Sequence, residues 1–221
     1  MTLCVIVPVK PFGSAKSRLS PVLAPAARRA LAQALFDHTM EALAGFSAPA
    51  LVMVVSRSAA ALHEAAARGF VPLKESRSSG LNTALAQAAA HAGDLGASRI
   101  LILPTDLPLL GRDDLDAMAA CDCAIAPDQH LAGTNALVWP TRIAPRFHFG
   151  ANSFARHLAF ARAMELDPEV VRRQGLACDV DLPGDLSFVS RNVFAAAAKP
   201  GRRRAPESGS DRGPGRGRRD D

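Results

Sequence analysis

Residues 99–110 read Arg-Ile-Leu-Ile-Leu-Pro-Thr-Asp-Leu-Pro-Leu-Leu, and this stretch decides the fold class. The continuous apolar run at 100–103 is typical of a strand that is buried on both faces of a parallel sheet. Pro104 lacks a backbone N–H and ends the hydrogen-bond ladder, so Thr105 and Asp106 follow the carboxyl end of this strand. In open α/β sheets, ligands bind at that edge.

Asp106 is therefore the first candidate site residue. Pro104 and Pro108 flank it and restrict the backbone, and a fixed carboxylate oxygen is the kind of ligand that Mg²⁺ prefers. A role in capping a turn explains the same residue equally well, and this stretch alone leaves both interpretations open.

The rest of the chain alternates between strand and helix patterns. Further strands are predicted at 3–9, 50–55, 70–73, 123–126, 133–140 and 177–180, and helices at 25–44, 59–68, 78–92, 113–120 and 183–198, with a helix entrance at 150–153. This alternation favours an α/β fold of three layers around a mostly parallel sheet.

The chain of 221 residues suits one domain, predicted over 1–198, followed by a disordered Arg/Gly/Pro-rich tail at 199–221. The tail holds eight basic and four acidic residues, a net charge of +4 out of the chain's +5. The body is thus nearly neutral, which argues against nucleic-acid binding, although a protein that binds nucleic acid through its basic tail stays an alternative.

The cysteine pattern and the apolar runs bear on location. The four cysteines, at 4, 121, 123 and 178, lack the spacing of a zinc site and are expected to be free thiols in a reducing compartment. No apolar run approaches the roughly 18 residues of a membrane span, and no signal peptide is evident. The sequence therefore predicts a cytoplasmic protein that is not bound to a membrane.

A cationic loop follows the first predicted strand. It contains Lys10, Gly13, Ser14, Lys16 and Arg18, and cations around small residues can surround a triphosphate. A solvated basic loop is the alternative. The loop matches neither the Walker motif nor the dinucleotide fingerprint, which disfavours a nicotinamide-dependent dehydrogenase.

Asn82 lies at the predicted start of the next helix, after Ser-Ser-Gly at 78–80. Its amide carries both a donor and an acceptor, so it could pair with a nucleobase. Capping of the helix accounts for the same residue equally well.

A second polar cluster is a candidate cradle for an anion. Thr134 and Ser153 supply hydroxyls, and Gly150 lets a ligand approach the backbone. His148 and His157 lie nearby in the sequence and are expected to be structural.

Asp181 is the second candidate metal ligand. It alternates with Asp179 in the predicted strand at 177–180 and its end, which would put both carboxylates on one face. Together with Asp106 it would make a metal site of two carboxylates, while an N-cap role at the following helix competes with this interpretation.

All these motifs fall at predicted strand ends, and together they suit nucleotidyl transfer. In that reaction Mg²⁺ neutralises phosphates and a bound phosphorylated acceptor attacks the α-phosphorus. Positioning and charge neutralisation supply most of the barrier reduction.

Six stretches in the same order resemble the phospholactate guanylyltransferase family of deazaflavin coenzyme F-420 biosynthesis. They read Val-Pro-Val-Lys-Pro-Phe-Gly-Ser-Ala-Lys-Ser-Arg-Leu at 7–19, Gly-Leu-Asn-Thr-Ala-Leu at 80–85, Leu-Pro-Thr-Asp-Leu-Pro-Leu at 103–109, Gly-Thr-Asn-Ala-Leu at 133–137, Phe-Gly-Ala-Asn-Ser-Phe at 149–154 and Asp-Val-Asp at 179–181. The resemblance covers the body to about residue 198. It implies a Rossmann-like nucleotidyltransferase fold similar to that of nucleotide-diphospho-sugar transferases.

The resemblance also implies a reaction and a set of roles. GTP would be the donor, pyrophosphate would be released, and 2-phospho-L-lactate, phosphoenolpyruvate or 3-phospho-D-glycerate would be the acceptor. Carried onto this chain, the acceptor would be held by Thr134, Gly150 and Ser153. Mg²⁺ would be held by Asp106 and Asp181. The phosphates of GTP would be faced by Lys10, Lys16 and Arg18. Lys16 and Asp106 would be the catalytic residues.

One departure from the family pattern concerns the acceptor. The helix entrance reads Gly-Ala-Asn-Ser at 150–153 where a Gly-Pro-Gly-Ser-like or Gly-x-x-Ser entrance is expected. Gly150 and Ser153 are kept, but Ala151 and Asn152 could reshape the acceptor site, so the identity of the acid stays open. A sugar-phosphate or molybdopterin acceptor on the same fold is the nearest alternative. A downstream transferase of coenzyme biosynthesis is a candidate partner, and a homodimer is a candidate assembly.

Overall fold

The computed structural model describes residues 2–49, 51–76 and 80–189, and the seven strands found there form one sheet in the order β3-β2-β1-β4-β6-β5-β7. They are β1 (Leu3–Val9), β2 (Leu51–Ser56), β3 (Val71–Lys74), β4 (Arg99–Ile102), β5 (Ala124–Pro127), β6 (Thr134–Pro140) and β7 (Glu169–Val170). Every neighbouring pair is parallel except the two that contain β6. The prediction of a mostly parallel sheet is confirmed.

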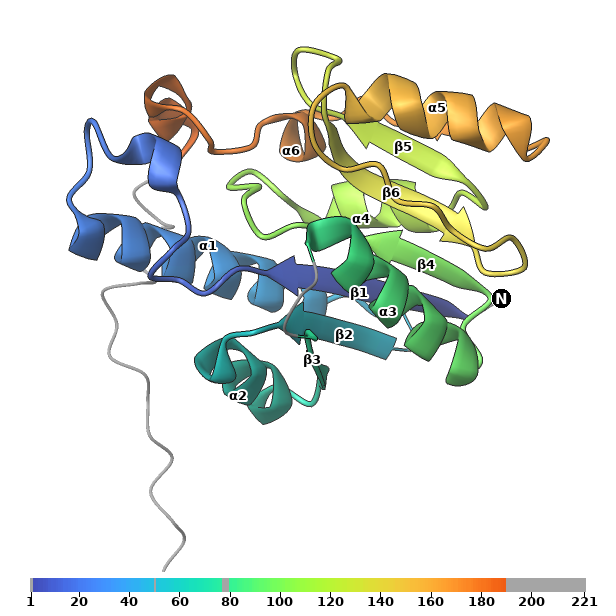
Figure 1. Cartoon of the computed structure of the whole chain (residues 1–221), viewed down its shortest axis with the longest axis horizontal. Helices are drawn as coiled ribbons and strands as arrows, with labels where there is room; N and C mark the ends of the chain where they lie inside the picture. Colours follow the sequence, from blue (N-terminus) through green and yellow to red (C-terminus); the bar gives the residue numbers. More distant parts are fainter. Residues whose placement is uncertain (1, 50, 77–79, 190–221) are drawn as a thin grey trace, which may run out of the picture.

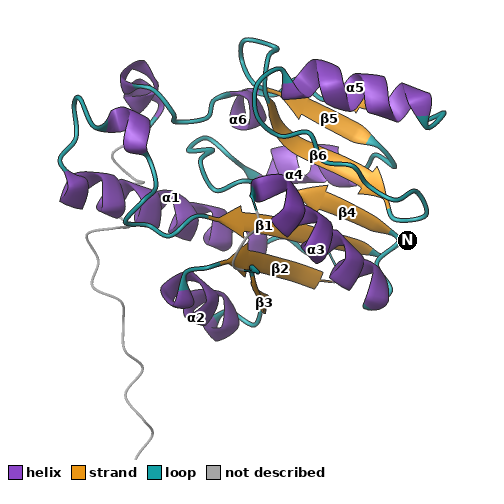
Figure 2. Cartoon of the chain, in the orientation of Figure 1, coloured by secondary structure: helices purple, strands orange, loops and turns teal. Residues whose placement is uncertain are grey.

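Helices cover both faces of this sheet (Figure 1, Figure 2). They are α1 (Pro25–Ala44), α2 (Ala59–Ala67), α3 (Leu81–Asp94), α4 (Arg112–Ala119), α5 (Ser153–Ala163) and the short α6 (Gln174–Ala177), with 3₁₀ turns at Ser17–Leu19 and Pro183–Phe188. Buried side chains of α1, α2, α4 and α6 pack on one face of the sheet, and those of α3 and α5 pack on the other. The predicted three layers are therefore present.

The position of β1 inside the sheet explains why its sequence is apolar without interruption. Val5 and Val7 point into the core beneath α1, whereas Cys4 and Ile6 point into the core beneath α3. All four are fully buried, so both faces of the strand exclude polar residues. Burying a side chain such as valine or isoleucine contributes roughly 1.5–3 kcal/mol.

The carboxyl ends of the parallel strands β1 to β4 meet at one edge of the sheet. Lys10, Arg57 and Glu75 directly follow β1, β2 and β3, and Asp106 follows β4 after Pro104. The chain therefore gathers four charged side chains at the edge where ligands bind in this class of fold.

The reversed strand β6 brings a different segment to that same edge. Ile102 of β4 lies opposite Leu137 of β6, so Thr134, the first residue of β6, lies three residues beyond the paired part. An antiparallel strand starts where its neighbour ends. Thr134 therefore lies on the side of the sheet from which Asp106 emerges.

Two predictions at the carboxyl end of the domain are wrong. The expected strand at 177–180 is the end of α6 followed by irregular chain, in which Val180 N–H donates to the carbonyl of Asp106 (3.0 Å). This segment crosses the end of β4 and pairs with no strand edge. The helix expected at 183–198 is a 3₁₀ turn at Pro183–Phe188; residues 190–198 and the predicted tail lie outside the described residues.

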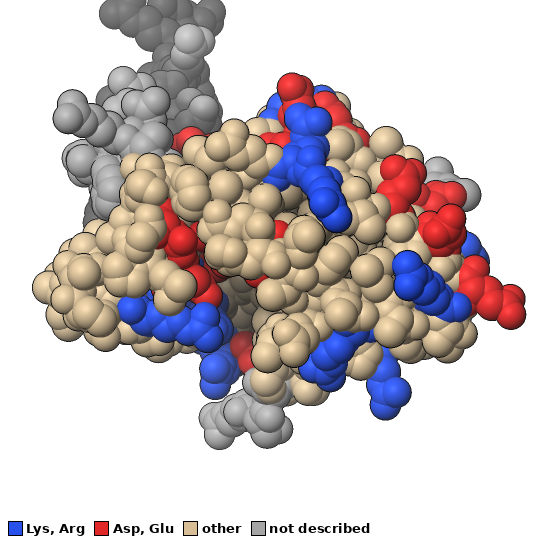
Figure 3. Space-filling view, turned by 90° about the horizontal axis from the view of Figure 1, so that it is seen from above, with Lys and Arg blue, Asp and Glu red and all other residues tan. Residues whose placement is uncertain are grey.

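Charged side chains of both signs lie on the surface of the described residues (Figure 3). On the face seen in Figure 3, basic and acidic side chains are interspersed, and no continuous basic patch of described residues is visible there. None of the described helices is both long enough and apolar enough to cross a bilayer.

Candidate active site

A cavity of about 480 Å³ opens at the carboxyl edge of β1, β2 and β3 and beside Asp106. Its lining combines the loop after β1, the first turn of α3 and the segment that follows β4. Lys10, Lys16, Asp106 and Asp181, all predicted as site residues, contribute to its walls. Arg57 and Glu75 line the same cavity.

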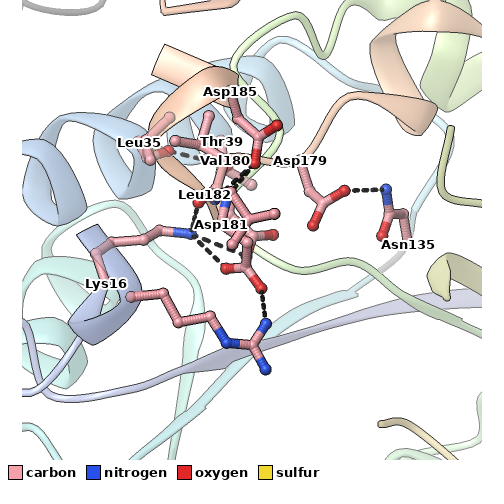
Figure 4. A network of polar contacts seen from close by, with 11 residues as sticks. Lys16, Leu35, Thr39, Asn135, Asp179, Val180, Asp181, Leu182 and Asp185 are labelled. Atoms are coloured by element: carbon pink, nitrogen blue, oxygen red, sulfur yellow. Dashed lines mark hydrogen bonds and ion pairs between the residues drawn. The ribbon is translucent and has the colours of Figure 1, made fainter. Parts of the chain in front are cut away.

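Lys16 joins the two predicted metal ligands, and Figure 4 shows its side chain against Val180 and Asp181. Its Nζ donates to Asp106 Oδ2 (3.0 Å) and to the carbonyl oxygen of Val180 (2.7 Å), and lies 3.6 Å from Asp181 Oδ1. The Lys16 side chain is only 9% exposed, so this ammonium is largely withdrawn from solvent. The geometry brings together three residues that are far apart in sequence.

The local backbone helps to place this lysine. Lys16 adopts a left-handed conformation (φ 55°) immediately before the 3₁₀ turn at Ser17–Leu19. For a residue with a Cβ this conformation costs on the order of 1 kcal/mol. Arg18, on that turn, pairs with Asp181 Oδ2 at 3.0 Å while 70% of its side chain is exposed. Lys16 thus lines the cavity and Arg18 lies outside its lining.

Asp179 adds a third carboxylate close to Asp106. Asn135 Nδ2 donates to Asp179 Oδ1 (3.2 Å) and to the carbonyl of Leu176 (2.9 Å), which fixes the segment before Asp181. Burial and then the negative charge of Asp106 raise the pKa of Asp179, although the bond from Asn135 opposes this shift. The two aspartates at 179 and 181 do not share a strand face, because the segment is irregular.

The structure allows a test of whether these residues suit Mg²⁺. The Lys16 ammonium lies within 4 Å of both Asp106 and Asp181, so the two carboxylates face one position for a cation. Carboxylate oxygens are the hard donors that Mg²⁺ uses, usually with several waters or phosphates as further ligands. No three His, Cys, Asp or Glu side chains of the described chain are grouped to hold a metal as they stand. The residues therefore fit a metal that arrives with phosphate ligands and takes the place of the ammonium.

The three predicted acceptor residues form a second polar cluster. Thr134 N–H donates to Ser153 Oγ (2.8 Å), and Ser153 N–H donates to the carbonyl of Gly150 (3.2 Å). Gly150 has φ +125°, a conformation that L side chains rarely adopt, and open space lies where a Cβ would stand. Helix α5 begins at Ser153, as the sequence indicates. None of the three lines the cavity beside Asp106.

His157 fixes the geometry of this cluster. It is 1% exposed, and its Nε2 accepts a hydrogen bond from the backbone N–H of His148 (2.9 Å) while its Nδ1 lies 2.9 Å from Thr134 Oγ1. Burial, with the nearby charges of His148 and Arg156, lowers the pKa of His157 to about 4. The ring is therefore neutral with its proton on Nδ1, which donates to Thr134 Oγ1. A structural role for this histidine is consistent with the expectation from the sequence.

Asn82 is hydrogen-bonded to the backbone of a loop that is distant in sequence. Its Nδ2 donates to the carbonyl of Phe149 (3.1 Å), and its Oδ1 accepts from the backbone N–H of the same residue (2.9 Å). One N–H of the amide and one lone pair of its oxygen are thus engaged, and contact of Asn82 with a nucleobase stays a prediction. Asn82 ties the loop before Gly150 to the first turn of α3.

Gly13 and Ser14 lie in an exposed turn of the cationic loop and do not line the cavity. Both the N–H and the hydroxyl of Ser14 donate to the carbonyl of Pro11 (2.9 and 3.0 Å). Contact of this turn with phosphates stays a prediction.

Arg57 and Glu75 were not predicted as site residues. Each of them is the first residue after a strand of the parallel sheet, as Lys10 is. This position after a strand is the signal that could have found them. Asp179 was noticed in the sequence but not assigned to the site, because its approach to Asp106 depends on the path of the chain after α6.

Comparison with known proteins gives the family. The family model described as "Guanylyl transferase CofC like" matches residues 3–190. This chain is a member of that family.

Named relatives of this CofC-like protein differ in their acceptors. It is 42% identical over 204 residues to the phosphoenolpyruvate guanylyltransferase of Sphaerobacter thermophilus, covering 90% of this chain and 97% of the relative. It is 37% identical to the 3-phospho-D-glycerate guanylyltransferase of Phenylobacterium zucineum (80% and 84% covered). It is 34% identical to the 2-phospho-L-lactate guanylyltransferase of Methanothermobacter thermautotrophicus (96% and 97% covered).

A solved structure supports the fold of the CofC-like chain. A crystal structure titled as a nucleotide-diphospho-sugar transferase of Desulfovibrio desulfuricans superposes with a TM-score of 0.71. It covers 87% of this chain and 88% of the other at 18% identity, which bears on the fold alone. The predicted nucleotide-diphospho-sugar transferase-like fold and the family resemblance are both confirmed.

Proposed function

We propose that this protein transfers GMP from GTP to the phosphate of a small phosphorylated three-carbon acid and releases pyrophosphate. The observation that carries the proposal is the cation position shared by Asp106 and Asp181 at a cavity of about 480 Å³. Membership in the CofC-like family and the names of the relatives support the choice of reaction.

The proposed chemistry needs no nucleophile from the protein. An oxygen of the acceptor phosphate attacks the α-phosphorus of GTP, and the bond from that phosphorus to the bridging oxygen breaks as pyrophosphate leaves. Lys10 and Lys16 line the cavity and supply positive charge to the triphosphate. Their contribution is positioning and electrostatic stabilisation.

Asp106 and Asp181 would hold Mg²⁺ once the Lys16 ammonium moves from between them. Bound there, Mg²⁺ would neutralise phosphate oxygens as charge develops on the leaving group. Lys16 could then turn from the carboxylates to the phosphates, because its flexible side chain carries its charge on a single rotatable ammonium.

Thr134, Gly150 and Ser153 are proposed to hold the acceptor. Thr134 Oγ1 accepts from His157, and Ser153 Oγ accepts from the Thr134 N–H. Each hydroxyl hydrogen is then available for donation to an anionic group of the acid. Phosphoenolpyruvate is the first acceptor to test, because the relative at 42% identity carries that name.

The proposed place of this reaction is an early step of coenzyme F-420 biosynthesis in the cytoplasm. All four cysteines are free and buried, which agrees with a reducing compartment. The product would join guanosine diphosphate to an acid and would have to be consumed by a transferase that displaces GMP.

The test is pyrophosphate release from GTP and Mg²⁺ with phosphoenolpyruvate, 2-phospho-L-lactate and 3-phospho-D-glycerate offered separately. We expect release that depends on one of these acids and is lost in Asp106→Asn. No release with any acid, from a folded protein that binds GTP, would contradict the proposed acceptor class and favour a sugar-phosphate or pterin acceptor. Release that does not depend on any acid would contradict group transfer.

A further inference from the structure

Arg57 and Glu75 form a charged pair in the wall of the cavity, at the end away from β4. Arg57 Nε lies 3.4 Å from Glu75 Oε2, and the Glu75 side chain is 12% exposed. Both residues line the cavity that also contains Lys16 and Asp106. The proposed chemistry of phosphate transfer uses neither of them.

The backbone of Glu75 is hydrogen-bonded to the neighbouring strand. Glu75 N–H donates to the carbonyl of Ser56 (3.0 Å), and Ser56 Oγ donates to the carbonyl of Val9 (2.7 Å), so the ends of β1, β2 and β3 are tied together. Gln87 of α3 donates through Nε2 to the carbonyl of Lys74 (3.2 Å). The carboxylate of Glu75 thus projects from backbone that is hydrogen-bonded to the end of β2.

The position of the pair fits a nucleobase that belongs to a triphosphate at Asp106. Three strand spacings of about 4.8 Å separate β4 from β3, on the order of 14 Å in total. Besides its charged residues, the lining of the cavity includes the apolar side chains of Val9, Val55 and Ala84. Apolar side chains of this kind can cover the flat faces of a base, while polar groups at the end of the cavity read the base edge.

We infer that Glu75 and Arg57 are the residues that select guanine. Guanine is the base whose pairing edge presents two adjacent donors, the N1–H and the N2 amino group, next to the O6 acceptor. A carboxylate can accept both donors and still receive the bond from Arg57, since it has about four acceptor sites. The Arg57 guanidinium donates to O6. This assignment rests on the proposed use of GTP.

Substitutions of the two residues are expected to have different effects on the use of an analogue of GTP. Inosine triphosphate keeps N1–H and O6 but lacks the N2 amino group. A hydrogen bond to a charged group contributes roughly 1.5–3 kcal/mol, so the wild type should prefer GTP to inosine triphosphate by about 10- to 100-fold in kcat/KM. Glu75→Gln replaces an acceptor oxygen by an amide N–H donor that faces the donors of the base. The ratio of kcat/KM for GTP to that for inosine triphosphate should therefore fall close to one. Arg57→Gln should weaken both nucleotides equally and leave the preference unchanged.

The experiment measures KM and kcat for both nucleotides, together with their equilibrium binding, in the wild type, Glu75→Gln and Arg57→Gln. Glu41→Gln makes the same exchange at an exposed position of α1 and is the matched control. We expect Glu75→Gln to raise the KM for GTP by about 10- to 100-fold with little change in kcat, because the base lies away from the reacting atoms. Thermal unfolding checks that each variant is folded.

The outcomes separate this inference from the proposed function. If the wild type turns over GTP and a folded Glu75→Gln protein keeps the same preference for GTP over inosine triphosphate, the inference is overturned. The proposed guanylyltransferase activity is then unaffected. An equal loss for both nucleotides in Glu75→Gln would reduce Glu75 to a structural role. A wild type that binds no guanine nucleotide would overturn both proposals.

Discussion

Replacing the buried His157 by asparagine tests the description of the proposed acceptor cluster. The neutral ring accepts from His148 through Nε2 and donates to Thr134 through Nδ1. Protonation would place a hydrogen on Nε2, directly against the N–H of His148, and would put a charge in a site that is 1% exposed. The folded protein should therefore resist protonation of this residue.

The size of the effect follows from the pKa. The pKa of His157 is lowered from 6.5 to about 4 in the folded protein, so the unfolded chain binds a proton at this position first as the pH falls. The contribution of neutral His157 to stability is complete above pH 6.5 and is lost as the pH falls toward 4. Between pH 7 and pH 4.5 this amounts to roughly 2–3 kcal/mol of the free energy of unfolding.

Urea unfolding of the wild type and of His157→Asn at these two pH values measures the effect. Asparagine keeps an N–H donor near the Nδ1 position but does not titrate, so the variant should lose roughly 2–3 kcal/mol less than the wild type on acidification. Carboxyl groups such as Asp179 titrate in both proteins and cancel in the comparison. His63→Asn, at an exposed position of α2, is the control and should behave as the wild type. An equal pH dependence in the wild type and His157→Asn would refute the assignment of a neutral His157.

Three further predictions concern the site and the ends of the chain. Asp106→Asn should lower kcat by at least about 100-fold in a folded protein, because it removes charge from the proposed metal site; activity near that of the wild type, with normal circular dichroism, would contradict that role. Asn82→Ala should lower the free energy of unfolding by about 1–3 kcal/mol, because it leaves both backbone groups of Phe149 without their partners; a denaturation midpoint that does not move would show that these bonds contribute little. A chain that ends at Ala198 should keep its pyrophosphate-release rate within about twofold, since the predicted tail cannot form a packed core; a folded but inactive product would assign the tail a role in the reaction.

Much of the sheet could be predicted because its strands are buried on both faces. The apolar runs that became β1 and β4 carry no competing helical pattern, and Pro104 marks the end of the second run. The site residues Lys10 and Asp106 then follow from the rule that parallel strands end at one edge. The same rule applied to the strands predicted at 50–55 and 70–73 would have pointed to within two residues of Arg57 and Glu75.

The remaining features depend on contacts between distant parts of the chain. The segment at 177–180 has the composition of a strand, but its backbone pairs with the carbonyl of Asp106. Asn82 has the position of a base reader or a cap, yet its amide is taken by Phe149, 67 residues away. The ion pair between Lys16 and Asp106 spans 90 residues and requires a left-handed backbone that a lysine seldom adopts. Local patterns contain no information on such partners.

The reversal of β6 has a consequence for how this enzyme family can change its substrate. Residues of β1 and β2, residues that follow β3 and β4, and the later Asp181 contribute to the cavity proposed for the nucleotide, whereas Thr134 and Ser153 lie outside its lining. Mutations at these two positions can therefore change contacts with the acceptor without altering a residue that lines the nucleotide cavity. Relatives whose names share the guanylyl group but differ in the acid are what such independence would produce. A chimera that exchanges the segment around residues 128–154 between two such relatives should use the acid of the parent that supplied the segment. It should still transfer the guanylyl group that the names of both parents share.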